Sequence, residues 1–387
     1  MSKSHTNHPY HLWFPNIFGF KGGIQVYSAF LLQALENLYP DRPYQVYLKH
    51  DTQSSPGLDQ GHQTDFHFTG QIPLPLRTPA FAAQIFLSGL RQSPELAIAT
   101  HLNFSPVAYW LKQLKGIPYW AIAHGVEAWN IERPLLKTAL RHADRILAVS
   151  HYTRDRLLKE QDLNPERVLL LPNTFDSDRF TIAPKPPYLL QRYGFSPETK
   201  ILLTVCRLDS QEQYKGYDRI LEALPTIISQ VPNLHYLIVG KGDDRPRVET
   251  LIQNLKLQDY VTLAGFIPDE ELCDHYNLCD LFAMPSKGEG FGIVYLEALA
   301  CGKPTLGGNQ DGAIDALCNG KLGALVNPDR VQEIAQTLIQ ILQRQYPNPL
   351  MYEPEALRQQ VIETFGFEQF QQTLQALMED FPLGGHP

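Results

Sequence analysis

Long hydrophobic runs are missing from this chain of 387 residues. A membrane-spanning helix needs about 20 consecutive apolar residues, and no segment approaches that length. The first ten residues are polar, with no apolar segment behind them, so we expect no signal peptide. Together these absences predict a soluble protein of the cytoplasm.

Cysteine is also scarce, and no two cysteines have the Cys-x-x-Cys spacing of a zinc or redox site. An odd number of widely spaced thiols argues against the disulfide framework of small secreted domains. The five thiols are expected to be reduced. They are Cys206, Cys273, Cys279, Cys301 and Cys318.

Positive charge is in deficit only in the second half. Residues 1–180 hold 17 Lys and Arg against 15 Asp and Glu, whereas residues 181–387 hold 16 against 26. Such an acidic half argues against nucleic acid as a partner, because phosphate contacts need clustered cations. One cationic run in the first half fits either a solvated helix face or contact with an anionic membrane surface. Its members are Arg133, Lys137, Arg141, Arg145, Arg154, Arg156 and Lys159.

Short β-rich runs alternate with helical patterns, which is typical of βαβ units and parallel sheets. A polar, proline-containing linker is expected between two series of strands, over Pro172–Pro187. The chain is therefore predicted to be an α/β protein with two Rossmann-like domains that face a cleft. The expected strands are His11–Phe14, Gln45–Lys49, Leu96–Thr100, Tyr119–Ala123, Arg145–Val149 and Val168–Leu171, then Lys200–Val205, Leu234–Val239, Val261–Leu263, Leu281–Ala283 and Pro304–Leu306.

A glycine-rich segment follows one of these strands in the second half. Gly290, Phe291 and Gly292 precede an expected helix, whose first amides have no partner within the helix and attract an anion. Glu289 comes just before that helix, and Glu297 lies about five residues inside it, or roughly 7.5 Å along the axis. Two carboxylates beside an anion site suit a nucleotide sugar. On spacing alone, a tight turn and an ordinary exposed helix glutamate explain the segment equally well.

This segment resembles glycosyltransferase family 4, a family of retaining enzymes with the two-domain GT-B fold. Glu289 and Glu297 match the family's Glu–x7–Glu motif, which continues as Glu-Ala-Leu-Ala-Cys-Gly-Lys to Pro304. The resemblance implies that Glu289 binds donor-sugar hydroxyls and that Glu297 binds the ribose. It extends along most of the chain and is weakest in residues 50–95.

Two cations of the second half form another candidate group. Arg207 follows an expected strand, and Lys215 lies just before the next helix. Two fixed cations can neutralise a diphosphate and stabilise its departure without a metal, although surface cations have the same appearance. Family 4 enzymes use an Arg and a Lys in this setting, so the resemblance assigns both to the leaving group. The polar run Asp209–Gln213 departs from the family pattern.

The first half contributes a glycine pair and a histidine. Gly22 and Gly23 stand where a helix begins, a place where amides can approach a phosphate and where plain turns also occur. His124 follows a strand, and a lone histidine is more often structural. In the resembling family, Gly-Gly closes on the donor diphosphate and a His-Gly lies near the transferred sugar. Glu127 and Trp129 are expected on the acceptor side.

Three further residues are expected to contact the donor, and one apparent metal-binding motif is rejected. Gly240, Gly265 and Phe266 follow strands of the second half, in segments that match the family where it contacts the donor. The Asp-Ser-Asp run at 176–178 has the form of a metal-binding motif from another glycosyltransferase fold. It lies in the linker, and no metal is expected.

The resemblance implies a retaining hexosyltransferase that uses an NDP-sugar, expected to be UDP-linked, without metal or cofactor. The acceptor is a hydroxyl of a growing polysaccharide, a glycolipid or a small sugar. We expect an acceptor-binding domain at 1–180, a donor-binding domain at 181–365, and a helix at 366–387 that packs back on the first. A nucleotide-sugar epimerase and a non-catalytic sugar-nucleotide-binding protein stay open as alternatives. The expected catalytic residues are Arg207, Lys215, Glu289 and His124.

Overall fold

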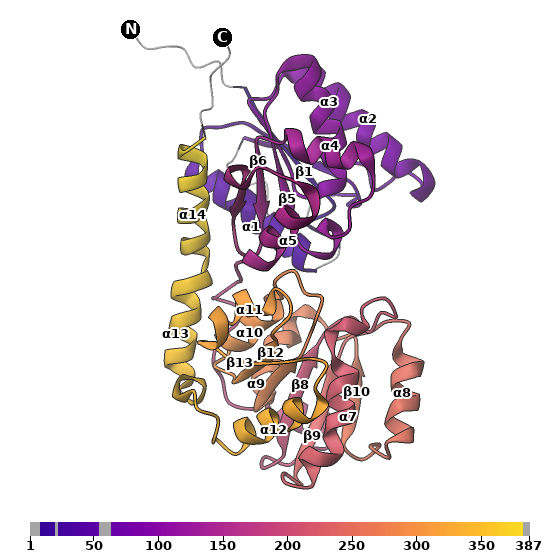
Figure 1. Ribbon diagram of the computed structural model, residues 1–387, viewed down its shortest axis with the longest axis vertical. Helices are drawn as coiled ribbons and strands as arrows, with labels where there is room; N and C mark the ends of the chain where they lie inside the picture. Colours follow the sequence, from indigo (N-terminus) through magenta and orange to yellow (C-terminus); the bar gives the residue numbers. More distant parts are fainter. Residues whose placement is uncertain (1–7, 20–21, 54–62, 382–387) are drawn as a thin grey trace. The chain divides into compact units, whose positions relative to one another are not determined.

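The computed structural model describes residues 8–19, 22–53 and 63–381. The chain divides into two compact units. Unit 1 comprises Met1–Thr174 together with Phe367–Pro387, and unit 2 comprises Phe175–Gly366. Figure 1 labels many of the elements of both units, and each unit is described by itself below.

Unit 1 is built on a seven-stranded sheet in the order β3-β2-β1-β4-β5-β6-β7, in which all pairs are parallel. Its central strands are continuous buried runs, as expected where helices cover both faces of a parallel sheet. The strands are β1 Tyr10–Phe14, β2 Tyr44–Leu48, β3 Thr64–Phe68, β4 Leu96–Ala99, β5 Tyr119–Ala123, β6 Arg145–Ala148 and β7 Val168–Leu170.

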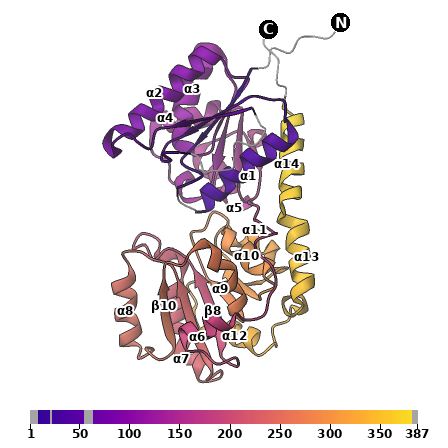
Figure 2. The ribbon, with the colours of Figure 1, turned by 180° about the vertical axis from the view of Figure 1, so that it is seen from behind.

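The helices of unit 1 include the last helix of the chain, which packs against the first one (Figure 2). Arg145 connects this helix to β6, because its guanidinium donates hydrogen bonds to the Leu377 carbonyl at 2.7 Å and to the Asp380 carboxylate at 2.7 Å. Arg145 is therefore a buried strand residue and no part of a solvated helix face. The helices are α1 Gly23–Leu38, α2 Leu74–Gln92, α3 Ser105–Lys115, α4 Pro134–His142, α5 His151–Gln161 and α14 Phe367–Glu379.

Unit 2 contains a six-stranded parallel sheet in the order β10-β9-β8-β11-β12-β13. Its strands are β8 Lys200–Val205, β9 Leu234–Val239, β10 Val261–Gly265, β11 Leu281–Met284, β12 Thr305–Gly308 and β13 Ala324–Val326. Its α-helices are α6 Pro187–Tyr193, α7 Tyr217–Ile228, α8 Arg245–Asn254, α9 Leu272–Leu278, α10 Ile293–Ala300, α11 Ala313–Ala316, α12 Val331–Leu342 and α13 Pro354–Phe365.

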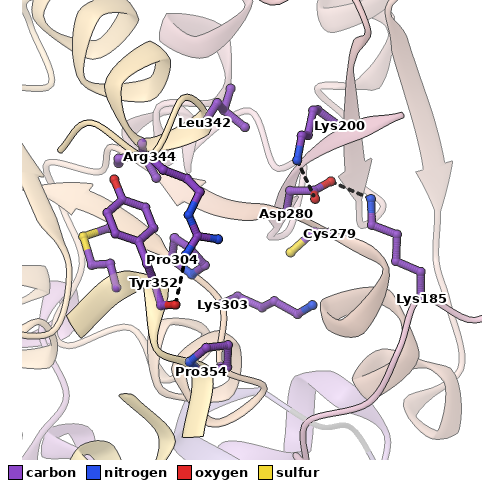
Figure 3. Close-up of a pocket in the computed structure, with 13 residues that line it drawn as sticks. Lys185, Lys200, Cys279, Asp280, Lys303, Pro304, Leu342, Arg344, Tyr352 and Pro354 are labelled. Atoms are coloured by element: carbon purple, nitrogen blue, oxygen red, sulfur yellow. Dashed lines mark hydrogen bonds and ion pairs between the residues drawn. The ribbon is translucent and has the colours of Figure 1, made fainter. Parts of the chain in front are cut away.

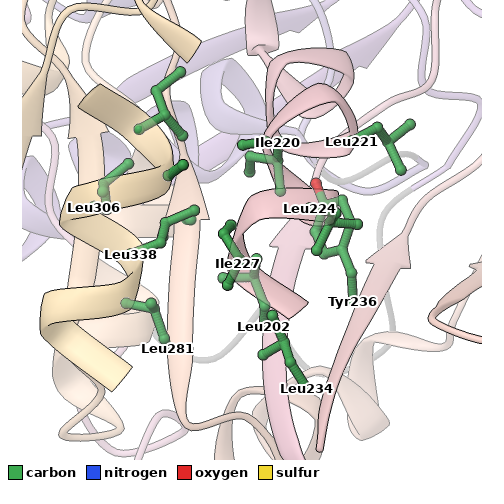
Figure 4. Packing of buried hydrophobic residues seen from close by; sticks show 14 of the residues in the cluster. Leu202, Ile220, Leu221, Leu224, Ile227, Leu234, Tyr236, Leu281, Leu306 and Leu338 are labelled. Atoms are coloured by element: carbon green, nitrogen blue, oxygen red, sulfur yellow. The ribbon is translucent and has the colours of Figure 1, made fainter. Parts of the chain in front are cut away.

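The core of unit 2 lies where α7 and α12 pack together over the sheet (Figure 4). Ile220, Leu224 and Ile227 recur at helical spacing on α7 and are fully buried. They belong to one apolar cluster with Leu338 of α12 and with strand residues such as Leu281. This packing holds the strand ends, and the loops that follow them, in fixed positions.

All eleven strands expected from the sequence are present, each with ends within two residues of the predicted ones. The prediction missed β3 and β13, which are the edge strands Thr64–Phe68 and Ala324–Val326. The first is polar and only partly buried, and the second has three residues, so neither has the continuous apolar run of a central strand.

Strand order reverses once in each sheet, between β1 and β4 in unit 1 and between β8 and β11 in unit 2. In open parallel sheets, ligands bind outside the carboxyl ends of the strands at this reversal. Among the helices of the described segments, none combines the length and the apolar character needed to cross a membrane.

Candidate functional site

The reversal point of the unit 2 sheet brings two predicted residues into contact. Lys215 ends a short 3-10 turn, Gln213–Lys215, and its ammonium pairs with the Glu289 carboxylate from the loop after β11. Both side chains are largely buried, with exposed fractions of 14% and 13%. Burial acts to lower the pKa of Lys215, but the Glu289 carboxylate and the phenolic oxygen of Tyr214 outweigh it, so that this pKa is raised.

Arg207 lies just after β8, and its guanidinium pairs with the Glu212 carboxylate. The Arg207 side chain is 61% exposed, whereas that of Glu212 is 14% exposed. Glu212 belongs to the polar run that departs from the family pattern, so this departure places a carboxylate on one of the two predicted phosphate-binding cations. Glu212 also acts to raise the pKa of Lys215, so both cation–carboxylate pairs belong to one electrostatic group.

The loop that carries Glu289 is held by Asp311, which is fully buried. One carboxylate oxygen of Asp311 accepts hydrogen bonds from the Glu289 amide at 2.7 Å and from the Ser286 hydroxyl at 2.7 Å. The other accepts the Ala313 amide at 3.0 Å. Burial raises the pKa of Asp311 to about 6, although these hydrogen bonds act to lower it. Asp311 is thus a positioning residue for Glu289, a role that its sequence context does not reveal.

The start of α10 has the form expected of an anion site. Gly292 caps the helix with a φ of 89°, and no side chain caps its first amides. A Cβ on Gly292 would lie 2.5 Å from the Tyr295 ring, so this turn requires glycine. Phe291 is buried with its ring 5.4 Å from that of Phe365, which leaves only its backbone for a ligand. A Cβ on Gly312 would lie 2.1 Å from the Gly290 carbonyl oxygen, so this close approach requires glycine at position 312.

Glu297 is buried inside α10, which contradicts the reading of it as an ordinary exposed helix glutamate. Its carboxylate accepts a hydrogen bond of 2.7 Å from the Tyr276 hydroxyl. Burial raises the pKa of Glu297 to about 7, while the Tyr276 hydrogen bond acts to lower it. The two carboxyl groups of the motif therefore differ: Glu289 is paired with a cation, whereas Glu297 is hydrogen-bonded to a phenol.

Three residues predicted for donor contacts lie at the ends of β9 and β10. The Gly240 amide donates to the Gly265 carbonyl at 2.8 Å, and a Cβ on Gly240 would lie 1.7 Å from the Cys206 carbonyl oxygen. Gly240 is therefore required by the close approach of two loops. Phe266 is 65% exposed, with the Lys241 ammonium 4.8 Å from its ring centroid. An exposed aromatic ring suits stacking against a flat ligand group.

In unit 1, the glycine pair begins α1. Gly22 is the N-cap residue, and its carbonyl accepts the Val26 amide at 3.0 Å. A Cβ on Gly23 would meet no atom within 4 Å, so the backbone here is open to a close approach. Among the described residues no side chain caps the helix, and its first turn has no acidic residue, so the positive end of the helix dipole is not compensated there.

His124 follows β5 and donates through Nε2 to the Thr100 carbonyl at 2.8 Å. Burial lowers the pKa of His124 to about 4, so the imidazole is neutral at pH 7 and Nδ1 is left as an acceptor. The Glu127 carboxylate accepts the His124 amide at 2.6 Å and thereby fixes this turn. The Arg156 guanidinium covers the Trp129 ring at 4.4 Å. The acceptor-side roles of Glu127 and Trp129 stay predictions.

A cavity of about 210 Å³ lies at the opposite edge of the unit 2 sheet (Figure 3). Lys185 and Lys200 share the Asp280 carboxylate there, at 2.6 and 3.6 Å. Asp280 immediately precedes β11 and Lys200 begins β8, so this cavity is at the amino ends of the strands. It is separate from Arg207, Lys215 and Glu289, which follow the carboxyl ends.

Family models match both halves of the chain. The model of glycosyl transferases group 1 matches residues 189–361, and that of glycosyltransferase family 4 matches residues 21–179. The chain is 34% identical over 237 residues to a GDP-mannose-dependent alpha-(1-6)-phosphatidylinositol monomannoside mannosyltransferase of Mycolicibacterium smegmatis. That match spans 57% of this chain and 60% of the relative. The chain is also 31% identical over 273 residues to alpha-D-kanosaminyltransferase of Streptomyces kanamyceticus, which covers 65% of this chain and 69% of the relative.

Solved structures share the fold. Anabaena HepE in complex with UDP and glucose has a TM-score of 0.77 at 20% identity, covering 97% of this chain and all of that one. The lipopolysaccharide glycosyltransferase WaaG has a TM-score of 0.70 at 17% identity, over 97% and 100%. The predicted GT-B fold is thereby confirmed. With both halves matched by family models, the chain belongs to the group 1 glycosyl transferases of glycosyltransferase family 4.

Proposed function

We propose that the chain transfers a hexosyl group from an NDP-sugar to an acceptor hydroxyl with retention of the anomeric configuration. The observation that carries the proposal is the contact of Lys215 with Glu289 at the reversal point of the unit 2 sheet. A cation for the departing diphosphate and a carboxylate for the sugar hydroxyls are held side by side, beside the uncapped start of α10.

The roles follow from the surroundings of each side chain. Arg207 and Lys215 stabilise the negative charge that develops on the diphosphate, and Glu289 orients the sugar, while Asp311 holds the Glu289 loop. Glu297 receives the ribose, and Phe266 stacks on the base. His124, neutral and fixed by Thr100, positions the transferred sugar. We propose that no metal takes part, because two cations already serve the leaving group.

The donor is tested with a panel of radiolabelled UDP- and GDP-sugars, together with glycolipid, oligosaccharide and small-sugar acceptors. Both bases belong in the panel, since the mannosyltransferase relative depends on GDP-mannose and HepE was solved with UDP. UDP is the base we propose. Transfer with retention and full activity in EDTA is the expected result. Donor binding without turnover across the panel would favour a non-catalytic binding protein, and conversion of the free donor would favour an epimerase.

We also propose peripheral contact with an anionic membrane surface through α2, α3 and α4. These helices contain no Asp or Glu, and α3 packs against both of the others. Their cations are Arg77, Arg91, Lys112, Lys115, Lys137 and Arg141. They also carry six of the nine exposed large hydrophobic side chains in the described part of the chain. These are Leu74, Leu76, Leu87, Trp110, Leu114 and Leu135.

Lys112 pairs with the Asp144 carboxylate at 2.6 Å, and the other cations lie among apolar side chains. Such a combination favours the interface of an anionic bilayer. Co-sedimentation with phosphatidylglycerol vesicles should therefore be strong and salt-sensitive, and weak with phosphatidylcholine. The double change Trp110→Ser with Leu114→Ser should abolish it. Tyr188→Ser, a change at an exposed aromatic residue of unit 2, is the matched control. Equal binding of the double variant and the wild type would contradict this contact.

A further inference from the structure

A cavity of about 260 Å³ opens in unit 1 beside the carboxyl ends of β1, β2 and β4. This is the reversal point of the sheet, where a ligand is expected on topological grounds. No acidic residue is among its lining residues in the described part of the chain. Its polar lining residues are Asn16, Gln25, Lys49, His50, His101 and Asn103.

Lys49, Arg77 and Arg133 bring positive charge to this cavity and its surroundings. The Lys49 ammonium forms no hydrogen bond or ion pair with any residue that the structure describes, although the side chain is half-buried. Behind the lining, Arg77 donates to Nδ1 of His50 at 3.3 Å, and Arg133 donates to the side-chain carbonyl of Asn103. Each of these two guanidiniums is thus held by a neutral residue of the cavity wall.

These groups act on one another as like charges do. Burial and then Arg77 lower the pKa of Lys49, and burial, Lys49 and Arg77 lower that of His50. Burial is the largest cause that lowers the pKa of His101, and Lys49 and Arg133 act in the same direction. Repulsion between Lys49 and Arg77 costs free energy in the empty protein, and a bound anion would relieve it.

Two carboxylates lie near, and both are already engaged. Asp51 acts to raise the pKa of His50, yet its buried carboxylate accepts the amides of residues 17, 18 and 19 at 2.6, 3.1 and 2.7 Å. Glu127 acts to raise the pKa of His101, and its carboxylate accepts the His124 amide. Each therefore fixes a loop and does not pair with a cation of the cavity.

We propose that this cavity binds a phosphate group carried by the acceptor substrate. Lys49 supplies the positive charge, His50 and His101 supply imidazole N–H groups, Asn103 supplies an amide group, and the start of α1 adds its dipole. His101 interacts electrostatically with His124, so the phosphate binds next to the predicted sugar-positioning histidine. The acceptor assignment rests on the proposed function, whereas the anion site itself does not.

The anion site is tested first, without turnover, by titrating the histidine resonances of the full chain with inorganic phosphate. Phosphate should raise the pKa of His50 and His101 by at least half a unit, because binding favours their charged forms. Lys49→Gln should weaken the phosphate effect at least fivefold. Lys287→Gln, a change at an exposed lysine of unit 2 that pairs with Asp329, should leave it unchanged. Histidine pKa values that do not respond to phosphate would overturn the site.

The source of the phosphate is tested by kinetics with matched acceptors. The KM of a phosphorylated sugar should be at least tenfold below that of its dephosphorylated form, and Lys49→Gln should reduce this ratio to near one. A soluble sugar phosphate and a phospholipid-linked sugar in vesicles separate a free acceptor from a lipid headgroup, and preference for either supports the proposal. A Lys49→Gln effect on the donor KM alone would overturn it and assign the cavity to the donor diphosphate. Phosphate binding without transfer to any acceptor would overturn the proposed function and leave the anion site standing.

Discussion

The carboxyl edges of the two sheets carry their positive charge in opposite ways. In unit 2, Lys215 pairs with Glu289 and Arg207 pairs with Glu212. In unit 1, Lys49 has no such partner among the described residues and its pKa is lowered. A diphosphate that binds to unit 2 must replace a carboxylate, whereas an anion that enters unit 1 meets uncompensated charge. If unit 2 binds the donor as proposed, these pairs position its cations before the donor arrives, at some cost in affinity.

The largest expected effect comes from removing the buried cation of unit 2. Lys215→Ala removes the buried cation, so kcat/KM for transfer should fall by a factor of about 10² to 10³, the range for loss of one group that stabilises developing charge. Steady-state kinetics measure it. Lys287→Ala, which breaks an exposed pair on the loop that carries Glu289, should stay within twofold of wild type. Since Lys215→Ala also leaves Glu289 unpaired, circular dichroism must show that the variant is folded. A folded variant with wild-type rates would contradict the account.

A carboxyl group without a paired cation sharpens the comparison within unit 2. Glu297 has a folded pKa of about 7 against the usual glutamate value of 4.5, so between these pH values the native state binds more protons than the unfolded state. Its stabilising contribution is present below pH 4.5 and is lost as the pH rises through about 7. From pH 5 to 8, the unfolding free energy of the wild type should fall by about 2–3 kcal/mol relative to Glu297→Gln.

Urea unfolding at each pH provides this measurement. Glu355→Gln, a change at an exposed glutamate of α13, is the control and should run parallel to the wild type. If the difference in unfolding free energy between wild type and Glu297→Gln does not change with pH, the carboxyl group has its usual pKa in the folded protein and is ionised at neutral pH.

An intermediate effect is expected at Asp311, the residue that holds the Glu289 loop. Asp311→Asn places an amide donor against one of the N–H or O–H groups that now donate to Asp311. We expect a loss of about 1–3 kcal/mol in stability, the usual cost of a buried unsatisfied group, and a higher KM for the donor with an unchanged KM for the acceptor. Thermal unfolding measures the loss of stability, and steady-state kinetics measure the two KM values. An unaltered donor KM would show that Asp311 does not position Glu289.

The smallest effect concerns the pair of Arg207 and Glu212. Glu212→Gln removes the carboxylate that competes with a diphosphate for Arg207, so the Kd of the nucleoside diphosphate should fall about two- to fivefold. A pair whose guanidinium is 61% exposed is worth less than about 1 kcal/mol. Calorimetric titration measures this Kd. Glu249→Gln, which breaks the exposed pair with Arg245 on α8, is the matched control. Weaker binding in Glu212→Gln would mean that Glu212 holds Arg207 in its binding position.

The sequence was sufficient to predict the strands, because central strands of parallel sheets are continuous apolar runs with turn residues at their ends. It was insufficient for the edge strands β3 and β13, since one is polar and the other has three residues. It predicted that Arg207 and Glu289 follow strands and that Lys215 lies just before a helix. The order of the strands, which makes β8 and β11 neighbours, was needed to place Lys215 against Glu289.

Other properties of the site depend on contacts that are distant in the chain. Asp311 reaches Glu289 across 22 positions, and Tyr276 reaches Glu297 across 21. The buried state of Glu297 could not be read from a helix of eight residues, because the helix is apolar on nearly all sides. Arg145 was grouped with surface cations by its neighbours in sequence, whereas its partners lie in α14.

A crystal structure with a bound, unhydrolysed UDP- or GDP-sugar tests the central claim most directly. The account predicts that the diphosphate lies within hydrogen-bonding distance of the Arg207 guanidinium and the Lys215 ammonium, with both carboxylate pairs opened and Glu289 turned to the sugar hydroxyls. A diphosphate bound elsewhere, with the Lys215–Glu289 pair intact, would contradict it.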